Sequence, residues 1–324
     1  MSRSTDAVMK YEKAVDQYIK NCQAIGLSKT TLNNYITTLS NFYGFFSDDS
    51  AQWKYQDPSF TTIQAYRNEL TASGAKKSTV GQRLMELRIF FNWASGEEGP
   101  QFYEKNPVSA KLSPKRNHRP YDTILTNEQI AKLWRYDYPI TYMQSRWDRN
   151  YALVVLLLTS KIRVSEALAV TPADLDWENG EIEVEHGKGD KYRVAPFPKI
   201  AQQAVQFYLK SGMRNPSLGD SDTLFDISDR GTLSRAVESH VRYVTGVNHV
   251  RSHDLRHIGS YLDLNAGKPL EELQAELGHN SPVTTQIYSG RLTARKNRGD
   301  VKGVFEEMEY QISRNDILLK NRAG

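Results

Sequence analysis

Two short segments carry arginine, glutamate and histidine at spacings that could bind and activate a phosphate. In the first, Glu166 follows Arg163 by three residues, so on a helix its carboxylate could hold the guanidinium. In the second, Ser-His-Asp-Leu-Arg-His, His253 and Arg256 are one helical turn apart and could reach the same point. A guanidinium offers paired donors to phosphate oxygens, and a histidine exchanges a proton near neutral pH.

Two further segments carry a lysine, a histidine and a tyrosine. Lys188 is flanked by glycines in His-Gly-Lys-Gly-Asp, which suits the tip of a tight hairpin. His279 follows Gly278, a predicted helix stop, and Tyr288 comes nine residues later. A tyrosine hydroxyl has an ordinary pKa of about 10, so it attacks phosphorus only if its proton is removed and the developing charge is stabilised.

Each segment has an ordinary interpretation when it is taken alone. Arg163 and Glu166 would form a surface ion pair, and Lys188 would be a solvated turn residue. Tyr288 would be a packed or hydrogen-bonded side chain. The order of the four segments, rather than any one of them, favours a chemical role.

The same residues do not indicate a metal site. His253 and His257 have the spacing of two ligands on a helix, but no acidic residue stands where a metalloprotease helix would place its general base. No third ligand is evident. Cys22 is the only cysteine, so neither an internal disulfide nor a cysteine-based metal site can form.

The first third of the chain predicts a small helical bundle. Apolar residues recur at helical spacing over residues 8–22, 32–46, 63–70 and 80–94, with Gly26, Ser28 and Gly74 at their boundaries. Helical spacing assigns the aromatic residues of these segments to a packed core rather than to a base-stacking platform.

The segment 106–121 contains three prolines and a basic cluster without helical periodicity, which is typical of an interdomain linker. After it, Thr126 and Gln129 have the spacing of a capping box. Helices are then expected over residues 150–158, 233–245, 252–266 and 270–277, and strands over residues 181–185 and 192–197. The predicted fold is mainly α, with two helical domains and one small antiparallel β-sheet in the second.

The charge of the chain fits a polyanionic partner. Its net charge is +4 and its pI is near 8.9. Basic residues exceed acidic ones between Gly74 and Arg119, in the last helix of the bundle and the linker after it. The candidates for DNA binding are Lys76, Lys77, Arg83, Arg88, Lys115, Arg116 and Arg119. A solvated helix face followed by a soluble linker explains the same residues equally well.

The chain has no apolar run long enough to cross a bilayer, and its polar start lacks the apolar core of a secretion signal. We therefore expect no membrane partner and a cytoplasmic location, associated with the nucleoid.

Together, the ordered motifs resemble those of the tyrosine recombinases, or phage-type integrases. The segment from Ser252 through Tyr288 resembles the family's signature block, including Leu-Gly-His and Thr-Thr-x-x-Tyr. The stretch KKSTVGQRLMELRIFFNWA, with the Asn-Pro and basic linker after it, is similar to the family's core-binding domain. The resemblance extends from about residue 8 to residue 290. One departure is Lys161, where the family usually has glycine, and it puts the local backbone turn in doubt.

The resemblance implies a role for each site residue. Tyr288 would be the nucleophile, Arg163 and Arg256 would hold the non-bridging oxygens, and Lys188 would be the general acid. His253 would exchange the tyrosine proton, His279 would donate a hydrogen bond to the phosphate or orient the tyrosine, and Glu166 would fix Arg163. The product would be a 3′-phosphotyrosyl link that conserves the bond energy, so no cofactor and no metal are implied.

The resemblance also implies an organisation. We expect a SAM-like core-binding domain over residues 1–112, a basic linker over 113–122, a catalytic domain over 123–300 and a tail over 301–324 that could be exchanged between protomers. The free protein would be a monomer or dimer. On double-stranded DNA with specific core sites it would form a homotetramer and pass through a Holliday junction.

Two alternatives stay open on the residues alone: a non-catalytic DNA-binding relative, and a topoisomerase or telomere resolvase of the same fold. We expect no arm-binding domain, because few residues precede the first helix. That favours a compact Xer-like or element-encoded integrase that acts on a short core site in integration, excision or resolution.

Overall fold

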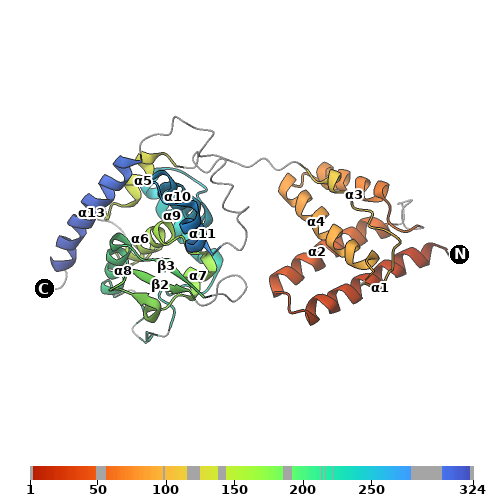
Figure 1. Cartoon of the computed structure of the whole chain (residues 1–324), viewed down its shortest axis with the longest axis horizontal. Coiled ribbons are helices and arrows are strands. Elements are labelled where there is room, and N and C mark those ends of the chain that lie inside the picture. Colours follow the sequence, from red (N-terminus) through yellow and green to blue (C-terminus); the bar gives the residue numbers. More distant parts are fainter. Residues whose placement is uncertain are drawn as a thin grey trace. The chain divides into compact units, whose positions relative to one another are not determined.

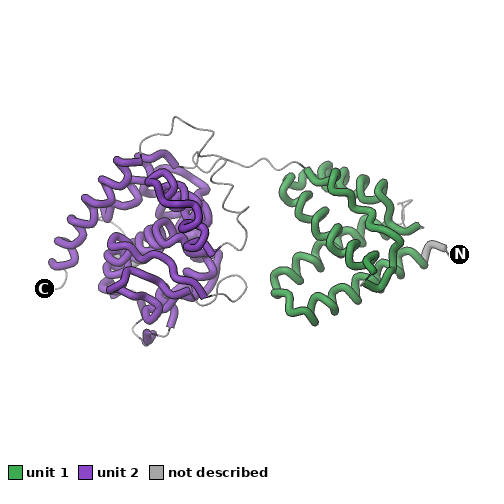
Figure 2. Tube along the Cα trace, in the orientation of Figure 1, with its two compact units in different colours: residues 1–118 green, residues 119–324 purple. Residues whose placement is uncertain are grey.

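The protein forms two compact units, residues 1–118 and 119–324, in a computed structural model (Figures 1 and 2). Each unit is described by itself. The structure describes residues 3–48, 56–97, 99–114, 125–137, 144–184, 192–212, 214–215, 217–220, 222–278 and 301–321. The described residues are mainly helical, as predicted.

Unit 1 is built on four helices, α1 (Arg3–Ala24), α2 (Lys29–Ser47), α3 (Phe60–Ala72) and α4 (Lys77–Ser95). Ser28 caps α2 by accepting a hydrogen bond from the backbone of Thr31, and Ser59 caps α3 in the same way. The predicted aromatic core is confirmed: Phe42, Phe46, Phe90 and Phe91 are fully buried, and Tyr35 is nearly so. The remaining aromatic residues of the stripe, Tyr43 and Trp93, pack against that core.

Unit 2 combines helices with one small sheet. Its helices are α5 (Asn127–Leu133), α6 (Gln144–Thr159), α7 (Val164–Ala169), α8 (Lys199–Lys210), α9 (Arg230–Thr245), α10 (Ser252–Asn265), α11 (Leu270–Leu277) and α13 (Lys302–Asn321). The antiparallel sheet has the order β1 (Leu175–Asp176), β2 (Glu181–Val184), β3 (Arg193–Pro196). The capping box of Thr126 and Gln129 and the strand pair β2–β3 are confirmed, whereas β1 was not predicted.

The centre of unit 2 is α6. Its residues from Tyr151 to Leu158 are almost completely buried, and α8, α9 and α10 pack around it. Contact between α6 and α10 is very close, because a Cβ added at Gly259 would lie 1.9 Å from the carbonyl oxygen of Leu158. The turn after α6 and the first residues of α10, which carry the predicted arginines and histidine, are thereby fixed to one core.

The tail helix α13 packs on α5 and α8 of its own chain. Val304 and Leu319 are buried in the core of unit 2, and the side-chain amide of Gln203 donates to the carbonyl oxygen of Ile312 at 2.8 Å. The predicted exchange of the tail between protomers stays a prediction. Among the described residues no helix is both long and apolar enough to cross a membrane.

Candidate active site

Arg163 lies at the point where α7 begins, and Glu166 holds it. The backbone N–H of Arg163 donates to Glu166 Oε2 at 2.6 Å, and its Nη1 donates to Oε1 at 2.7 Å. The predicted pairing of these two residues is therefore present. Glu166 is 3% exposed. Burial alone would raise the pKa of its carboxyl, but the nearby Arg193 guanidinium and the hydrogen bonds from Arg163 outweigh burial, so the pKa lies below its usual value.

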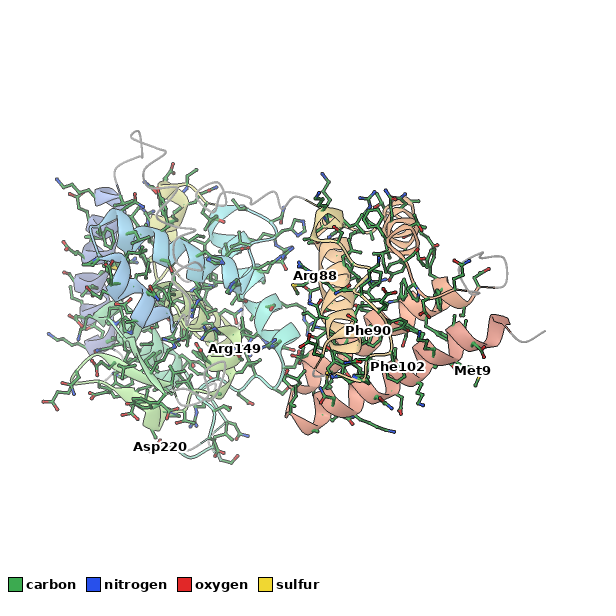
Figure 3. All side chains as sticks on the ribbon, turned by 45° about the vertical axis from the view of Figure 1, so that its right-hand side comes forward. Met9, Arg88, Phe90, Phe102, Arg149 and Asp220 are labelled. Carbon is green, nitrogen blue, oxygen red and sulfur yellow. The ribbon has the colours of Figure 1, made fainter. Side chains whose placement is uncertain are left out.

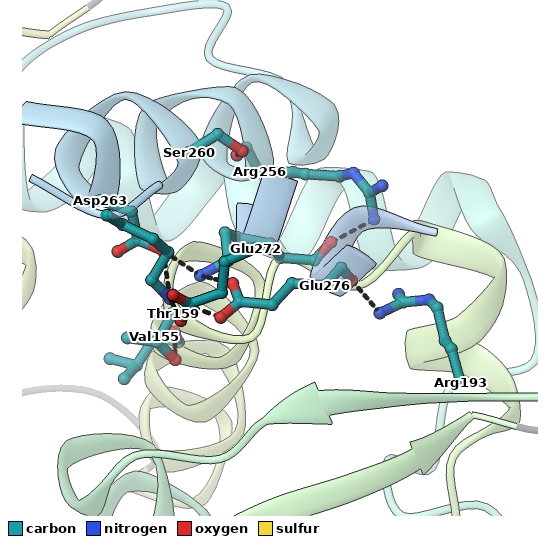
Figure 4. Close-up of polar contacts among 10 residues, drawn as sticks. Val155, Thr159, Arg193, Arg256, Ser260, Asp263, Glu272 and Glu276 are labelled. Atoms are coloured by element: carbon teal, nitrogen blue, oxygen red, sulfur yellow. Dashed lines mark hydrogen bonds and ion pairs between the residues drawn. The ribbon is translucent and has the colours of Figure 1, made fainter. Parts of the chain in front are cut away.

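Arg193 is a site residue that was not predicted. From the start of β3 its Nη2 donates to Glu166 Oε2 at 2.6 Å, and its Nη1 donates to the carbonyl oxygen of Glu276 at 2.5 Å. Figure 4 shows the side chain reaching from the strand toward α11. A sequence signal did exist, because Arg193 lies in the second strand of the predicted lysine hairpin, but its partners are distant in sequence.

Arg256 is buried in α10 and meets Arg163 at the end of α11. Its Nη2 donates to the carbonyl oxygen of Leu277 at 2.7 Å, and its Nη1 donates to the carbonyl oxygen of Lys161. Arg163 Nη2 lies 3.3 Å from the carbonyl oxygens of both Leu277 and Gly278. Two guanidinium groups from distant parts of the sequence therefore share the Leu277 carbonyl.

His253 lies in the first turn of α10, on the same helix as Arg256. Burial lowers the pKa of its imidazole, and the positive charges of Arg256 and Arg163 lower it further, against a weaker opposite effect of Asp254. The ring is therefore neutral at neutral pH and able to accept a proton. The ring of His257 lies beside it, with centroids 4.4 Å apart.

Three predicted catalytic residues, Lys188, His279 and Tyr288, lie outside the described residues, and their roles stay predictions. The described neighbours of two of them are nevertheless informative. Strands β2 and β3 pair in register on either side of the Lys188 segment, with Val184 opposite Arg193. Gly278, directly before His279, ends α11 with a left-handed φ of 59°, and a Cβ there would lie 2.8 Å from the Arg193 side chain.

The turn before Arg163 keeps a left-handed residue although it has no glycine. Lys161 has a φ of 54°, a conformation that favours glycine. The turn is therefore present although a lysine stands where the family usually has glycine. Its carbonyl oxygen is the acceptor for Arg256.

The predicted DNA-binding residues that the structure describes belong to one helix. Lys76 directly precedes α4, at its N-cap position, and Lys77, Arg83 and Arg88 lie along the helix. Lys76, Lys77 and Arg88 are exposed. The neighbouring Phe90 is buried, and Figure 3 labels it beside Arg88. Lys115, Arg116 and Arg119 lie outside the described residues. DNA contact by this set stays a prediction.

Comparison with known proteins identifies the family. A model described as "Phage integrase family" matches residues 123–295, and one described as "Phage integrase, N-terminal SAM-like domain" matches residues 7–98. A tyrosine recombinase XerC of Thermodesulfovibrio yellowstonii is 30% identical over 273 residues, which cover 82% of this chain and 86% of that protein. A tyrosine recombinase XerC of Bacillus pumilus is 27% identical over 277 residues, with coverages of 81% and 86%.

Solved structures share the fold. The XerH site-specific recombinase in a post-cleavage complex with palindromic difH substrate has a TM-score of 0.67 and 23% identity, covering 86% of this chain and 82% of that one. A lambda integrase(75-356) dimer bound to a COC' core site has a TM-score of 0.65 and 19% identity, covering 90% and 99%. The resemblance predicted from the ordered motifs is confirmed, and the chain belongs to the phage integrase family.

Proposed function

We propose that this chain is a site-specific tyrosine recombinase that cuts and rejoins DNA through Tyr288. The observation that carries the proposal is the meeting of Arg163 and Arg256 at the carbonyl of Leu277, two residues before His279. Phosphoryl transfer is catalysed mainly by positioning and by stabilising charge on the equatorial oxygens, and two adjacent guanidinium groups supply both.

The remaining residues complete the proposed chemistry. The hydroxyl of Tyr288 attacks the scissile phosphorus, its proton passes to His253, and Lys188 protonates the departing 5′ oxygen. His279 donates a hydrogen bond to the phosphate or orients Tyr288. Glu166 positions Arg163 without touching DNA. Because the 3′-phosphotyrosyl bond keeps the energy of the broken strand, rejoining needs no nucleotide cofactor.

The proposed partner is duplex DNA with a short core site. The relatives with solved structures include a XerH bound to difH and a lambda integrase bound to a core site, which supports a DNA substrate here. We propose that α4 and the linker form the DNA-binding face. The proposed core-binding domain is residues 1–112, the linker 113–122, the catalytic domain 123–300 and the tail 301–324. Four protomers would exchange strands through a Holliday junction, in the cytoplasm at the nucleoid.

A nicked suicide DNA that carries candidate core sites tests the chemistry. Cleavage next to the nick releases a short fragment, so the covalent protein–DNA adduct accumulates and survives detergent. The adduct is expected with the wild-type chain and not with Tyr288→Phe. A wild-type chain that binds the site without an adduct would favour the non-catalytic alternative. An adduct that persists in the variant would remove Tyr288 from its role.

A further inference from the structure

Lys161 combines two features that a lysine rarely has. Its backbone is left-handed, which is unfavourable for a residue with a Cβ and persists only where the surroundings hold it. Its side chain is 2% exposed, although a lysine charge is costly to bury without a partner. The turn needs the left-handed φ but not a lysine, because a glycine would adopt the same φ without a penalty.

The charge of Lys161 is balanced inside a four-residue cluster. Its Nζ lies 2.5 Å from Asp263 Oδ2 and 3.0 Å from Glu276 Oε2. Lys268 Nζ lies 3.1 Å and 2.5 Å from carboxylate oxygens of the same two acids. We call Lys161, Asp263, Lys268 and Glu276 the ion-pair cluster; it joins the turn after α6 to α10 and α11. Figure 4 shows its two acids, Asp263 and Glu276.

The cluster shares its backbone with the arginine site. The carbonyl of Lys161 accepts from Arg256, and the carbonyl of Glu276 accepts from Arg193. The next residue, Leu277, supplies the carbonyl that Arg163 and Arg256 share. Each of the three arginines therefore donates to a backbone carbonyl that belongs to a residue of the cluster or to its chain neighbour Leu277.

The stem of Lys161 also lies where α6 and α10 touch. A Cβ at Gly259 would come within 3.2 Å of Lys161 Cγ, so the lysine stem occupies the space that this glycine leaves open. The side chain is therefore confined near Cγ by Gly259 of α10 and at Nζ by the carboxylates of Asp263 and Glu276.

We propose that Lys161 is a positioning residue for the active-site arginines: its buried ion pairs hold the left-handed turn and the end of α11, and so aim Arg256 and Arg163. The inference rests on the proposed function of that arginine site. A glycine at this position could adopt other backbone conformations. The ion pairs of Lys161 instead tie the turn to Asp263 on α10 and to Glu276 on α11.

Three variants separate the side chain from the backbone. Lys161→Met keeps the stem and removes the charge. Lys161→Gly keeps the left-handed turn and removes the side chain. The double variant Lys161→Met with Glu276→Gln restores the balance of charge and keeps the carbonyl of residue 276. Lys132→Met, which removes an exposed ion pair with Glu128 on α5, is the matched control.

The measurement is the rate of adduct formation at saturating suicide DNA, beside DNA affinity and thermal unfolding. For Lys161→Met and Lys161→Gly we expect cleavage about 10- to 100-fold slower, with DNA affinity unchanged. The double variant should recover part of that rate, and Lys132→Met should keep all of it. Wild-type rates in either single variant would overturn the proposal. If Lys161→Met does not fold, Lys161→Gly and the double variant provide the same comparison.

A DNA with a neutral methylphosphonate in place of the scissile phosphate distinguishes positioning of the arginines from a general structural role of Lys161. The quantity compared is the ratio of wild-type to Lys161→Met cleavage rates on the two DNAs. The methylphosphonate carries less charge for the arginines to stabilise, so this ratio should fall toward one. An equal ratio on both substrates would show that Lys161 does not act through the arginines. A wild-type chain without any adduct would instead overturn the proposed function, and the inference with it.

Discussion

Arg163 and Arg256 lie close enough to share one acceptor, and their like charges oppose that arrangement. Besides the Leu277 carbonyl that both share, Arg163 is held by the buried carboxylate of Glu166, and Arg256 by the carbonyl of Lys161. Fixed donors of this kind need no rearrangement when charge develops on a phosphate. Pre-organisation of the two arginines therefore depends on acceptors from three separate segments.

The pH dependence of cleavage should report His253. Its pKa lies below the ordinary value of 6.5, because burial and the charges of Arg256 and Arg163 disfavour the protonated ring. A proton acceptor must be neutral, so the rate of adduct formation should decline in acid, and the midpoint of that decline should lie below pH 6.5. His253→Gln should be slower and lack this acid decline. A wild-type rate that already falls between pH 8 and pH 7 would contradict the assignment.

His240 should make unit 2 sensitive to acid without any part in catalysis. It is 2% exposed, neither ring nitrogen has a hydrogen-bond partner, and burial lowers its pKa to about 3. The unfolded chain therefore binds more protons than the folded one between pH 6.5 and pH 3, and stability is lost as pH falls through that window. At about pH 5 the loss should be about 2 kcal/mol.

The free energy of unfolding in urea, measured at about pH 7 and at about pH 5, tests this sensitivity. His240→Leu should lose less stability than the wild type on going from about pH 7 to about pH 5. The control is His249→Asn, because His249 is exposed and its left-handed backbone suits asparagine. If His240→Leu and the wild type respond alike, the buried imidazole is not the source of the acid sensitivity.

At the scale of elements, the contact of α6 with α10 determines where the site residues of α10 lie. Gly259→Ala would place a Cβ 1.9 Å from the Leu158 carbonyl, so one helix must shift. We expect a loss of about 1–3 kcal/mol in the free energy of unfolding and a slower rate of adduct formation, since Arg256 moves with α10. The matched control is Gly303→Ala on α13, where a Cβ meets nothing within 4 Å. Equal stability of the two variants would contradict the close contact.

Local patterns were sufficient to predict most elements of this chain. Periodicity marked the helices of unit 1, and the spacing of Thr126 and Gln129 marked the start of α5. Strands β2 and β3 followed from alternation and a glycine-flanked turn, whereas β1 has only two residues and carries no such signal. These features depend on neighbours in the sequence, so they are visible before any tertiary structure is known.

The site was predictable only in part, because several of its contacts are not local. Arg163 with Glu166 is a short-range pair and was found. Arg193 with Glu166 spans 27 positions, and Lys161 with Asp263 spans 102. The lysine was noticed only as a departure from the family pattern. Its partners lie on α10 and α11, and no spacing rule connects three separate elements.

At the scale of the whole molecule, the predicted exchange of the tail concerns the surface of unit 2 on which α13 packs. This surface is formed by α5 and α8, and we call it the α13 seat. Alongside its buried apolar residues, α13 contributes Glu307, which forms a partly exposed ion pair with Arg135, just after α5. In that pair Nε and Nη2 of the arginine lie 3.0 Å and 3.3 Å from the two carboxylate oxygens. A partly exposed ion pair adds little net stability, and the same pair could form with a neighbouring protomer, so this contact is compatible with the predicted exchange of the tail.

Charge reversal across this seat distinguishes exchange from docking within one chain. Arg135→Glu and Glu307→Arg should each bind DNA normally but lose recombination, because like charges face one another in every seat, and the double variant should recover it. An equal mixture of the two single variants decides the question. With exchange, the reversed tail of one protein meets the reversed seat of the other, so recombination returns in part. If the tail docks only in its own chain, the mixture stays as inactive as its components.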